Sequence, residues 1–362
     1  MQDLIELFHR TESVYGKYYD VHICSPKEID EVLSFIDKYW QKGHILTKSK
    51  ELLDWQHFDK ENDRYNFVLA KHKQTGEIHG LIGFITSNIF DESIKTPIRW
   101  GAIWKVRNDV AIKGLGVYLK GYMEENVPSK YIGGVGLSND SREIDTKLGE
   151  RVGKLKQYYI VNPKIESYSL VKNVKHLPLI EAKSIKGCSF KEITKDQFVD
   201  GAALFEEKIM PYKSVKYYIN RYFRHPIYEY KCMMLTNCHY ETNEVFVYRV
   251  CGALGKRYIF IVDYIGDGVA LRGAYNEFCQ LLLKENAECI CFPCEGINDE
   301  LLIEGGFRRR DDTDVVLPIY FEPFVCQNVE LDYHFWPNDQ ECVLVKGDAD
   351  QDRPNMLPED YR

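Results

Sequence analysis

Apolar and polar residues alternate along residues 98–106, and a period of two predicts a β-strand. A helical repeat follows, with its apolar residues on one face: Leu115, Leu119, Tyr122 and Met123. The turn between the two carries Gly114 and Gly116. Glycine lets the backbone approach an anion closely, and the first amides of a helix point toward such an anion. The pattern therefore predicts a strand, a glycine turn and a helix, a layout that suits phosphate binding but is also that of an ordinary strand-to-helix turn.

Strand and helix patterns continue downstream of this turn. Tyr131–Leu137 is expected to be the next strand, and the loop after it begins with Ser138, a residue type that caps helices. Arg142–Leu148 is expected to form a short helix that ends at Gly149. Lys154–Val161 then has the apolar character of a further strand.

The chain upstream of the turn has its own strand and helix patterns. Val21–Cys24 is expected to be a strand, and Pro26–Lys42 repeats its apolar residues at helical spacing after a Ser-Pro start. Glu51–His57 is expected to be a second helix. Two alternating runs, Phe67–His72 and Glu77–Thr86, are joined by a turn that contains Thr-Gly, which indicates a β-hairpin.

This order of elements resembles the GCN5-related N-acetyltransferase (GNAT) superfamily, whose acetyl-CoA loop reads Arg/Gln-x-x-Gly-x-Gly/Ala. Gly114 and Gly116 match the two glycine positions, whereas Ala111 stands where the family has Arg or Gln. That departure removes a side chain but leaves the backbone amides in place. The resemblance implies an α/β (α+β) fold in which a mixed, mostly antiparallel central sheet is flanked by helices.

The resemblance also implies which residues bind the co-substrate, acetyl-CoA or another acyl-CoA. The pyrophosphate would be held by the backbone amides of the turn, with Lys113 adding positive charge; these residues are Lys113, Gly114, Leu115, Gly116 and Val117. The backbone of Trp104, Lys105 and Val106 would hold the thioester carbonyl and the pantetheine arm.

The chemistry implied by the resemblance is direct attack of an amine on a thioester, which needs a group that removes a proton. The general-base candidates are His57, Asp54 and His79. Many family members place a tyrosine four residues before the glycine of the last helix, where it protonates the leaving thiolate. Asp145 occupies that place here, so this role has no residue assigned to it.

The second half of the chain repeats the order of elements of the first. The amphipathic helix that starts near Leu271, the strand at Cys289 and the helix stop at Gly306 follow at a nearly constant offset from their counterparts. We therefore expect two GNAT-like domains in tandem. The second has Asp267-Gly268 in place of Gly-x-Gly, and Asp267 would repel a pyrophosphate. The expected boundaries are an arm at 1–20, the acyl-CoA domain at 21–163, a linker at 164–186, the second domain at 187–345 and an acidic tail at 346–362.

Composition limits the classes of partner. Acidic residues outnumber basic ones, 55 to 47, and the net charge of −8 argues against a large nucleic-acid surface. The eleven cysteines are scattered and lack zinc spacing, which predicts reduced thiols in a cytoplasmic protein. No apolar run approaches about 18 residues, so no membrane span is expected. The sequence does not predict the oligomeric state.

The tail contains Gly347-Asp-Ala-Asp-Gln-Asp-Arg-Pro354. Its alternating aspartates share one feature with calcium loops, but the later Gly and Glu of an EF-hand are missing, so no metal is expected. The tail looks similar to one on tandem GNAT-like proteins of bacterial surface-polysaccharide synthesis. This resemblance implies a small-molecule acceptor such as an amino sugar or sugar nucleotide.

The leading interpretation is an acyl-CoA-dependent N-acyltransferase, in the first place an N-acetyltransferase, that acts on a small amine. Two alternatives remain open. One is a Fem-like peptidyl transferase that uses aminoacyl-tRNA, against which the acidic balance counts. The other is a catalytically inactive tandem GNAT that serves as a binding module. The missing tyrosine favours this last alternative, and the retained Gly-x-Gly opposes it.

Overall fold

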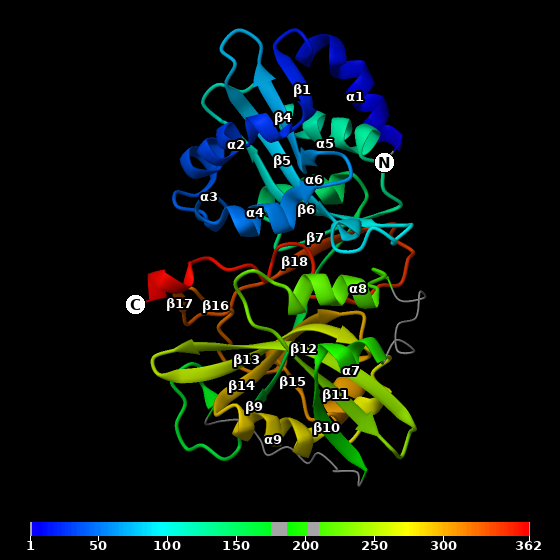
Figure 1. Ribbon diagram of the computed structural model, residues 1–362, viewed down its shortest axis with the longest axis vertical. Helices are drawn as coiled ribbons and strands as arrows, with labels where there is room; N and C mark the ends of the chain where they lie inside the picture. Colours follow the sequence, from blue (N-terminus) through cyan, green and yellow to red (C-terminus); the bar gives the residue numbers. More distant parts are fainter. Residues whose placement is uncertain (1, 175–186, 201–209, 362) are drawn as a thin grey trace. The chain divides into compact units, whose positions relative to one another are not determined.

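The computed structural model describes residues 2–174, 187–200 and 210–361. The chain divides into two compact units, each with its own main sheet (Figure 1). The first unit comprises Met1–Val152, Tyr333–Asp339 and Arg353–Arg362. The second comprises Gly153–Asp332 and Gln340–Asp352. Each unit therefore combines segments that lie far apart in the sequence.

The first unit contains a seven-stranded mixed sheet, in the order β1-β4-β5-β6-β7-β18-β8. The strands are β1 (Tyr19–Ile23), β4 (Phe67–His72), β5 (Ile78–Thr86), β6 (Ile98–Val106), β7 (Tyr131–Val135), β8 (Arg151–Lys154) and β18 (Asp332–Trp336). β6 and β7 run parallel, whereas the pairs β1–β4, β4–β5, β5–β6 and β7–β18 are antiparallel. A small hairpin of β2 (Phe58–Asp59) and β3 (Arg64–Tyr65) stands apart.

Helices cover both faces of this sheet (Figure 1). On one face, α1 (Gln2–Tyr15) packs along α5 (Leu115–Asn126), and α5 packs on the sheet. Leu119 is fully buried there, and burial of such a side chain stabilises the fold by about 1.5–3 kcal/mol. Helical segments between β1 and β2 lie on the other face, where α2 and α4 contact β5. These segments are α2 (Ile29–Phe35), the π-helix η2 (Ile36–Trp40), α3 (Ile45–Lys48) and α4 (Lys50–His57).

β6 leaves its neighbour β7 part of the way along its length. The parallel register joins Ile98–Trp100 to Tyr131–Gly133 and ends there. Against β5, Ile82 is paired with Trp104 but Phe84 with Gly101, so β6 carries an extra residue at this point. Such a bulge bends the strand and increases its twist. The second half of β6 therefore has β5 on one edge and no strand partner on the other.

The second unit contains an eight-stranded mixed sheet, in the order β10-β11-β12-β13-β14-β9-β15, with β19 paired to β14. The strands are β9 (Lys156–Val161), β10 (Cys188–Ile193), β11 (Lys231–Asn237), β12 (Thr242–Ala253), β13 (Lys256–Ile265), β14 (Ala287–Glu295), β15 (Arg308–Arg309) and β19 (Leu344–Val345). β13 and β14 are parallel, as β6 and β7 are in the first unit. The helix α9 (Tyr275–Lys284) connects them, as α5 connects the first pair.

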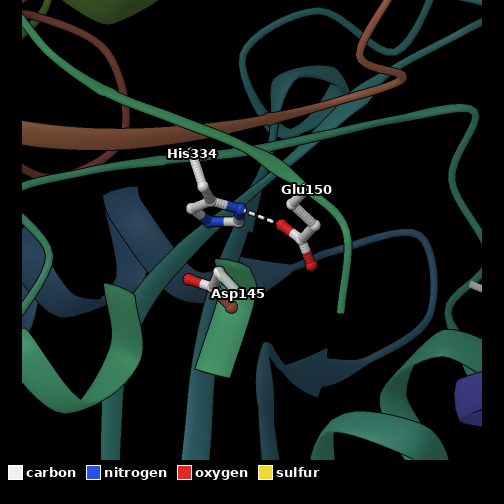
Figure 2. A group of neighbouring side chains, drawn as sticks. All are labelled: Asp145, Glu150 and His334. Atoms are coloured by element: carbon white, nitrogen blue, oxygen red, sulfur yellow. Dashed lines mark hydrogen bonds and ion pairs between the residues drawn. The ribbon is translucent and has the colours of Figure 1, made fainter. Parts of the chain in front are cut away.

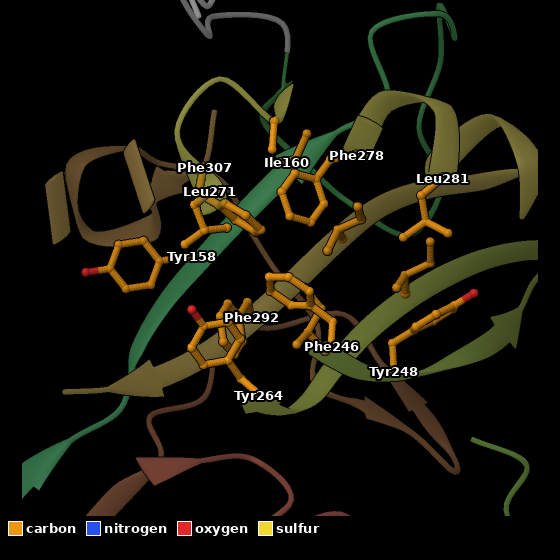
Figure 3. Packing of buried hydrophobic residues seen from close by; sticks show 14 of the residues in the cluster. Tyr158, Ile160, Phe246, Tyr248, Tyr264, Leu271, Phe278, Leu281, Phe292 and Phe307 are labelled. Atoms are coloured by element: carbon orange, nitrogen blue, oxygen red, sulfur yellow. The ribbon is translucent and has the colours of Figure 1, made fainter. Parts of the chain in front are cut away.

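An aromatic core lies between this sheet and the helices α9 and α10 (Asp299–Glu304) (Figure 3). Phe278 of α9 meets Phe246 of β12 and Phe307 edge to face, with ring centroids 5.7 and 4.8 Å apart. Such pairs add about 0.5–1.5 kcal/mol beyond the burial of area. The high content of aromatic residues thus has a packing role in this unit.

One predicted strand joins a different sheet than expected, and one strand of the first sheet was not predicted. Lys156–Val161 was expected in the first domain, but it forms β9 in the second sheet, where Tyr158 and Ile160 are buried in the aromatic core. Asp332–Trp336 was not predicted as a strand, yet as β18 it pairs with β7. Val316–Phe321 and Glu341–Val345 were also expected to be strands; the structure has the shorter strands β16 (Tyr320–Phe321), which pairs with β17 (Phe324–Val325), and β19 (Leu344–Val345), which pairs with β14.

The acidic tail is largely built into the fold. Asp348 pairs with Lys213, which also binds Asp263 at 2.9 Å. Asp352 accepts hydrogen bonds from Arg249 at 2.9 Å and Lys346 at 2.6 Å. The cations that bind these buried carboxylates are therefore side chains of the chain itself.

Four further expectations concern the linker, the N-terminal arm, membrane spans and the cysteines. Residues 175–186 of the expected linker lie outside them. The expected N-terminal arm is the helix α1 and the turn after it, packed on the first unit. No helix in the described part of the chain is long and apolar enough to cross a membrane. The eleven cysteines are all unpaired thiols.

Candidate active site

The turn between β6 and α5 presents three backbone amides without a partner. Leu115 N–H donates to the carbonyl of Ile112, and Val117 N–H donates to the carbonyl of Gly114, both at 3.1 Å. The amides of Lys113, Gly114 and Gly116 have no acceptor among the described residues. Of the five amides expected to bind pyrophosphate, these three remain available at the positive end of the α5 dipole.

Gly114 and Gly116 are needed for different reasons. Gly114 has φ = +89°, in the left-handed region that other residues rarely adopt, and a Cβ there would lie 2.5 Å from the hydroxyl of Tyr15. At Gly116 a Cβ would lie 3.2 Å from Nε1 of Trp104. A side chain at Gly114 would clash with Tyr15, whereas one at Gly116 would press on the ring of Trp104 and require it to shift.

Two tyrosines and an arginine hold the turn in place. Tyr15 of α1 donates a hydrogen bond to the carbonyl of Lys113 at 2.8 Å, and the hydroxyl of Tyr19 accepts one from Ile112 N–H at 3.2 Å. Arg107, where β6 ends, pairs with Asp109 and Glu77, both at 2.9 Å. Asp109 is thereby neutralised at the entrance to the turn.

The second half of β6 leads from the turn to the point where β6 and β7 separate. Trp104, Lys105 and Val106 are half-buried and lie on this part of the strand. Their β7-facing edge has no strand partner. An extended group can add to such an edge through backbone hydrogen bonds.

His57 has a position that argues against a role as general base. Its side chain is fully buried, its Nδ1 lies 3.1 Å from the carbonyl oxygen of Phe84, and its Nε2 lies 3.1 Å from the side-chain amide of Gln56. Burial lowers the pKa of His57 to about 3. Both ring nitrogens are therefore engaged in the core.

Asp54 and His79 lie at separate places, and both have partners. Asp54 accepts hydrogen bonds from the hydroxyl of Tyr65 at 2.5 Å and from Lys50 at 2.9 Å. His79 is buried beside Tyr19, whose hydroxyl lies 3.3 Å from Nδ1, and its carbonyl accepts from Arg107 N–H. Burial lowers the pKa of His79. The three general-base candidates therefore do not form one group. His79 lies beside the turn between β6 and α5, because Tyr19 contacts both.

A buried charged cluster lies on the α5 side of the β6–β7 separation, and the sequence analysis did not find it. It comprises Lys120 of α5, Asp145 of α6 (Asn139–Lys147), Glu150 and His334 of β18. Lys120 binds Asp145 and Glu150, the latter at 2.6 Å, and Glu150 binds Nδ1 of His334 (Figure 2). All four side chains are buried.

The ammonium group of Lys120 offsets part of the negative charge of the two carboxylates. Burial lowers the pKa of Lys120, but the two carboxylates outweigh this, so its pKa lies above the ordinary value. Burial raises the pKa of Glu150, and the hydrogen bonds and charges of His334 and Lys120 outweigh that, which holds its pKa at about 2. Asp145, Glu150 and His334 are close enough together to suggest a metal site. The ammonium group of Lys120 already bridges the two carboxylates, so the donor set does not suit a metal ion.

One local signal for His334 was present in the sequence. Tyr333 and Phe335 alternate with it in a run rich in aromatic residues, which is typical of a strand. The pairing with β7, which places the imidazole, joins residues far apart in the chain and has no such signal.

The corresponding turn of the second unit is occupied by a carboxylate from its own chain. Gly268 has φ = +91°, like Gly114, but the N–H of Ala270 donates to Glu244 at 2.8 Å. Glu244 is fully buried, and burial raises its pKa to about 7. A Cβ on Gly268 would lie 2.9 Å from Leu301, so the turn is also closed by an apolar side chain.

Comparisons with known proteins give similarity in structure alone. No protein-family model matches the chain, and a search of curated proteins finds no significant match. The chain is similar to a GCN5-related N-acetyltransferase from Anabaena variabilis ATCC 29413, with a TM-score of 0.54 and 8% identity over 88% of this chain and 72% of that one. It is also similar to a probable N-acyltransferase from Enterococcus faecalis V583, with a TM-score of 0.50 and 8% identity over 87% and 71% of the two chains.

N-myristoyltransferase from Saccharomyces cerevisiae also matches, with a TM-score of 0.45 and 10% identity over 88% of this chain and 78% of that one. At identities this low, the similarity concerns the fold. Mixed sheets flanked by helices agree with the similarity to the protein from Anabaena variabilis. The fold of this chain is therefore the fold of GCN5-related N-acetyltransferases.

Proposed function

We propose that this protein is an acyl-CoA-dependent N-acyltransferase, and in the first place an N-acetyltransferase. The observation that carries the proposal is the set of three unpartnered amides, at Lys113, Gly114 and Gly116, where α5 begins. They suit the pyrophosphate of CoA, because backbone N–H groups and the helix dipole both favour an anion there. Lys113 is exposed and adds a positive charge.

The unpaired edge of β6 supports the placement of the rest of the co-substrate. The pantetheine arm carries amide groups that can pair with the backbone of Trp104, Lys105 and Val106. This would bring the thioester to the place where β6 and β7 separate. An amine held there would attack the carbonyl carbon directly, and the enzyme would contribute by positioning and by removing a proton.

We propose that the first unit alone binds acyl-CoA. In the second unit the carboxylate of Glu244 accepts the amide at the corresponding turn, and Asp267 adds a negative charge beside it. A pyrophosphate would have to displace a buried group of the chain.

The proposed acceptor is a small amine, and an amino sugar or sugar nucleotide of surface-glycan synthesis is the specific candidate. It is supported only by the resemblance of the Gly347–Pro354 segment to tails of proteins in that process. The proposed location is the cytoplasm, where the eleven unpaired thiols would stay reduced. Aminoacyl-tRNA transfer has no supporting observation in the described residues.

Calorimetric titration with acetyl-CoA and with free CoA tests the proposal. We expect micromolar binding to the wild type and at least about tenfold weaker binding to Gly116→Val, because its side chain fills the space beside the free amides. Gly252→Ala is the matched control, because a Cβ at Gly252 of β12 has no neighbour closer than 3.6 Å. Unchanged acetyl-CoA affinity in a folded Gly116→Val protein would contradict the loop assignment, and absence of wild-type binding would contradict the proposed function.

A further inference from the structure

The imidazole of His334 lies in a slot that two glycines leave open. Its strand β18 pairs His334 with Gly134 of β7, and a Cβ on Gly134 would lie only 2.5 Å from Nε2 of the imidazole. A Cβ on Gly101 of β6 would lie 3.8 Å from the same atom. The ring is therefore inserted over the two strands at the place where their pairing ends.

The two nitrogens of this ring have different surroundings. Nδ1 is bound to Glu150. Nε2 has no hydrogen-bond partner among the described residues. Unlike the fully enclosed unpartnered atoms of the described chain, it keeps some solvent-accessible surface. The ring is thus held at Nδ1, and its Nε2 is not fully enclosed, although only 7% of the side chain is exposed.

Glu150 fixes which nitrogen carries the proton. A carboxylate accepts a hydrogen bond, so Nδ1 bears the hydrogen and the lone pair of the neutral ring is on Nε2. Lys120 in turn holds Glu150 as a carboxylate, because its ammonium group lies 2.6 Å from the Glu150 side chain. A carboxylate that orients an imidazole is the arrangement by which enzymes prepare histidine as a base.

The free nitrogen lies next to the proposed path of the acyl group. Gly101 follows the last residue of β6 that pairs with β7, and the bulge in β6 comes directly after it. Lys120 of the cluster lies 5.7 Å from the ring of Trp104, one of the strand residues proposed to hold the pantetheine arm. The cluster and the proposed thioester position therefore lie along the same part of β6, where its pairing with β7 ends.

We infer that His334 is the general base of the transfer reaction and that Glu150 is its positioning residue. This inference rests on the proposed function. The nitrogen of the acceptor amine forms a C–N bond with the thioester carbonyl carbon, and Nε2 of His334 takes the proton that the nitrogen loses. The C–S bond breaks with its electron pair on sulfur, and the imidazolium returns the proton to the thiolate. Amine and acyl-CoA thus give amide and CoA thiol.

A histidine with a purely structural role would have both ring nitrogens bonded to groups of the core. Glycine at position 134 is needed simply to make room for the ring, whereas an Nε2 without a hydrogen-bond partner is not needed for packing. His57 shows the structural case in the same unit, because both of its nitrogens lie within hydrogen-bonding distance of core groups. His334 differs in having one nitrogen held and the other presented.

A first experiment does not depend on the acceptor. Histidine ring ¹⁵N spectra of the full chain are recorded with and without acetyl-CoA, and the His334 signals are assigned by their loss in His334→Asn. We expect the neutral tautomer with hydrogen on Nδ1 and a shift of the Nε2 resonance when acetyl-CoA is added. The opposite tautomer, or no shift under saturating acetyl-CoA, would overturn the inference.

A second experiment measures turnover. Release of CoA thiol from acetyl-CoA is followed with a panel of amino sugars and amino-sugar nucleotides, and in their absence with water as acceptor. Asparagine retains a donor near the position of Nδ1 but lacks Nε2, so we expect His334→Asn to lower kcat about 10²- to 10⁴-fold while the acetyl-CoA Kd changes less than about twofold. Glu150→Gln is expected to lower kcat with little change in the KM for acetyl-CoA. His239→Asn, at an exposed position, is the control.

The outcomes separate the two proposals. Full turnover in His334→Asn would overturn the general base and leave the acyltransferase intact. If the wild type does not bind acetyl-CoA, both the proposed function and the inference fail. Loss of turnover together with loss of acetyl-CoA binding in a folded His334→Asn protein would also overturn the inference, because it would show a binding role instead.

Discussion

The hydroxyl of Tyr15 donates a hydrogen bond to the carbonyl oxygen of Lys113, and the same hydroxyl fills the space that a Cβ on Gly114 would need. The helix α1 thus reaches the turn that presents the free amides. The ring of Tyr15 also stacks on the ring of Tyr118 of α5, with ring centroids 4.4 Å apart. The N-terminal segment is therefore part of the candidate acyl-CoA site.

Tyr15→Phe should weaken acetyl-CoA binding without unfolding the unit. The ring can still stack on Tyr118, but the hydrogen bond to Lys113 is lost, at a cost of about 0.5–1.5 kcal/mol. If the turn needs this bond to hold its amides in position, the Kd rises about two- to tenfold in calorimetric titration. Tyr18→Phe is the control, because Tyr18 is exposed and its hydroxyl has no partner among the described residues. Equal affinities of the two variants would show that α1 does not shape the turn.

The local parts of this site follow from local sequence. Alternation predicts β6, and apolar spacing predicts α5, because side-chain direction repeats with a period of 2 in strands and 3.6 in helices. The two glycines between them show where the backbone must turn closely. The structure confirms the strand Ile98–Val106 and the helix that starts at Leu115.

The non-local parts do not follow in the same way. Alternation predicts that Lys156–Val161 is a strand, but it does not predict which sheet the strand joins. His334 and Glu150 are 184 positions apart, and they meet because β18 lies between β7 and β8 in the sheet and Glu150 directly precedes β8. His57 was selected because it stands in a polar and aromatic stretch, whereas its complete burial depends on Phe67 and Phe84 of neighbouring strands.

Lys120→Met should destabilise the first unit strongly. It removes the cation that bridges Asp145 and Glu150 and leaves two buried carboxylates without it. Removal of one partner from a buried ion pair costs about 3–5 kcal/mol. We expect the free energy of unfolding, measured by urea denaturation at neutral pH, to fall by this amount.

Lys147→Met is the matched control for Lys120→Met. Lys147 pairs with Glu143 on the surface of α6, where both side chains are about 70% exposed. Exposed pairs of this kind contribute about 0.3–0.5 kcal/mol. If Lys120→Met costs no more than Lys147→Met, the cluster is solvated and its proposed role in holding Glu150 ionised is wrong. Addition of zinc or of a chelator should change the stability of neither variant.

Glu244→Gln should stabilise the second unit at alkaline pH. Burial raises the pKa of Glu244 to about 7 in the folded chain from an ordinary value of 4.5. Between these two values the folded state holds a proton that the unfolded state has released, so the free energy of unfolding falls as pH rises through this window. The full loss is roughly 3 kcal/mol above pH 7, since one pKa unit corresponds to about 1.4 kcal/mol.

Glutamine keeps an oxygen that can accept from Ala270 N–H but carries no charge, so the variant should lack this dependence on pH. Urea denaturation at pH 4.5 and pH 8 checks the expectation: the two proteins should differ little at pH 4.5, and the variant should be more stable at pH 8. Glu341→Gln, at an exposed position, is the control and should follow the wild type. A wild type that is equally stable relative to Glu244→Gln at both pH values would show that folding does not raise the pKa of Glu244, so that its carboxylate is ionised at pH 8. The turn of the second unit would then hold a charged carboxylate where the first unit is proposed to hold a pyrophosphate.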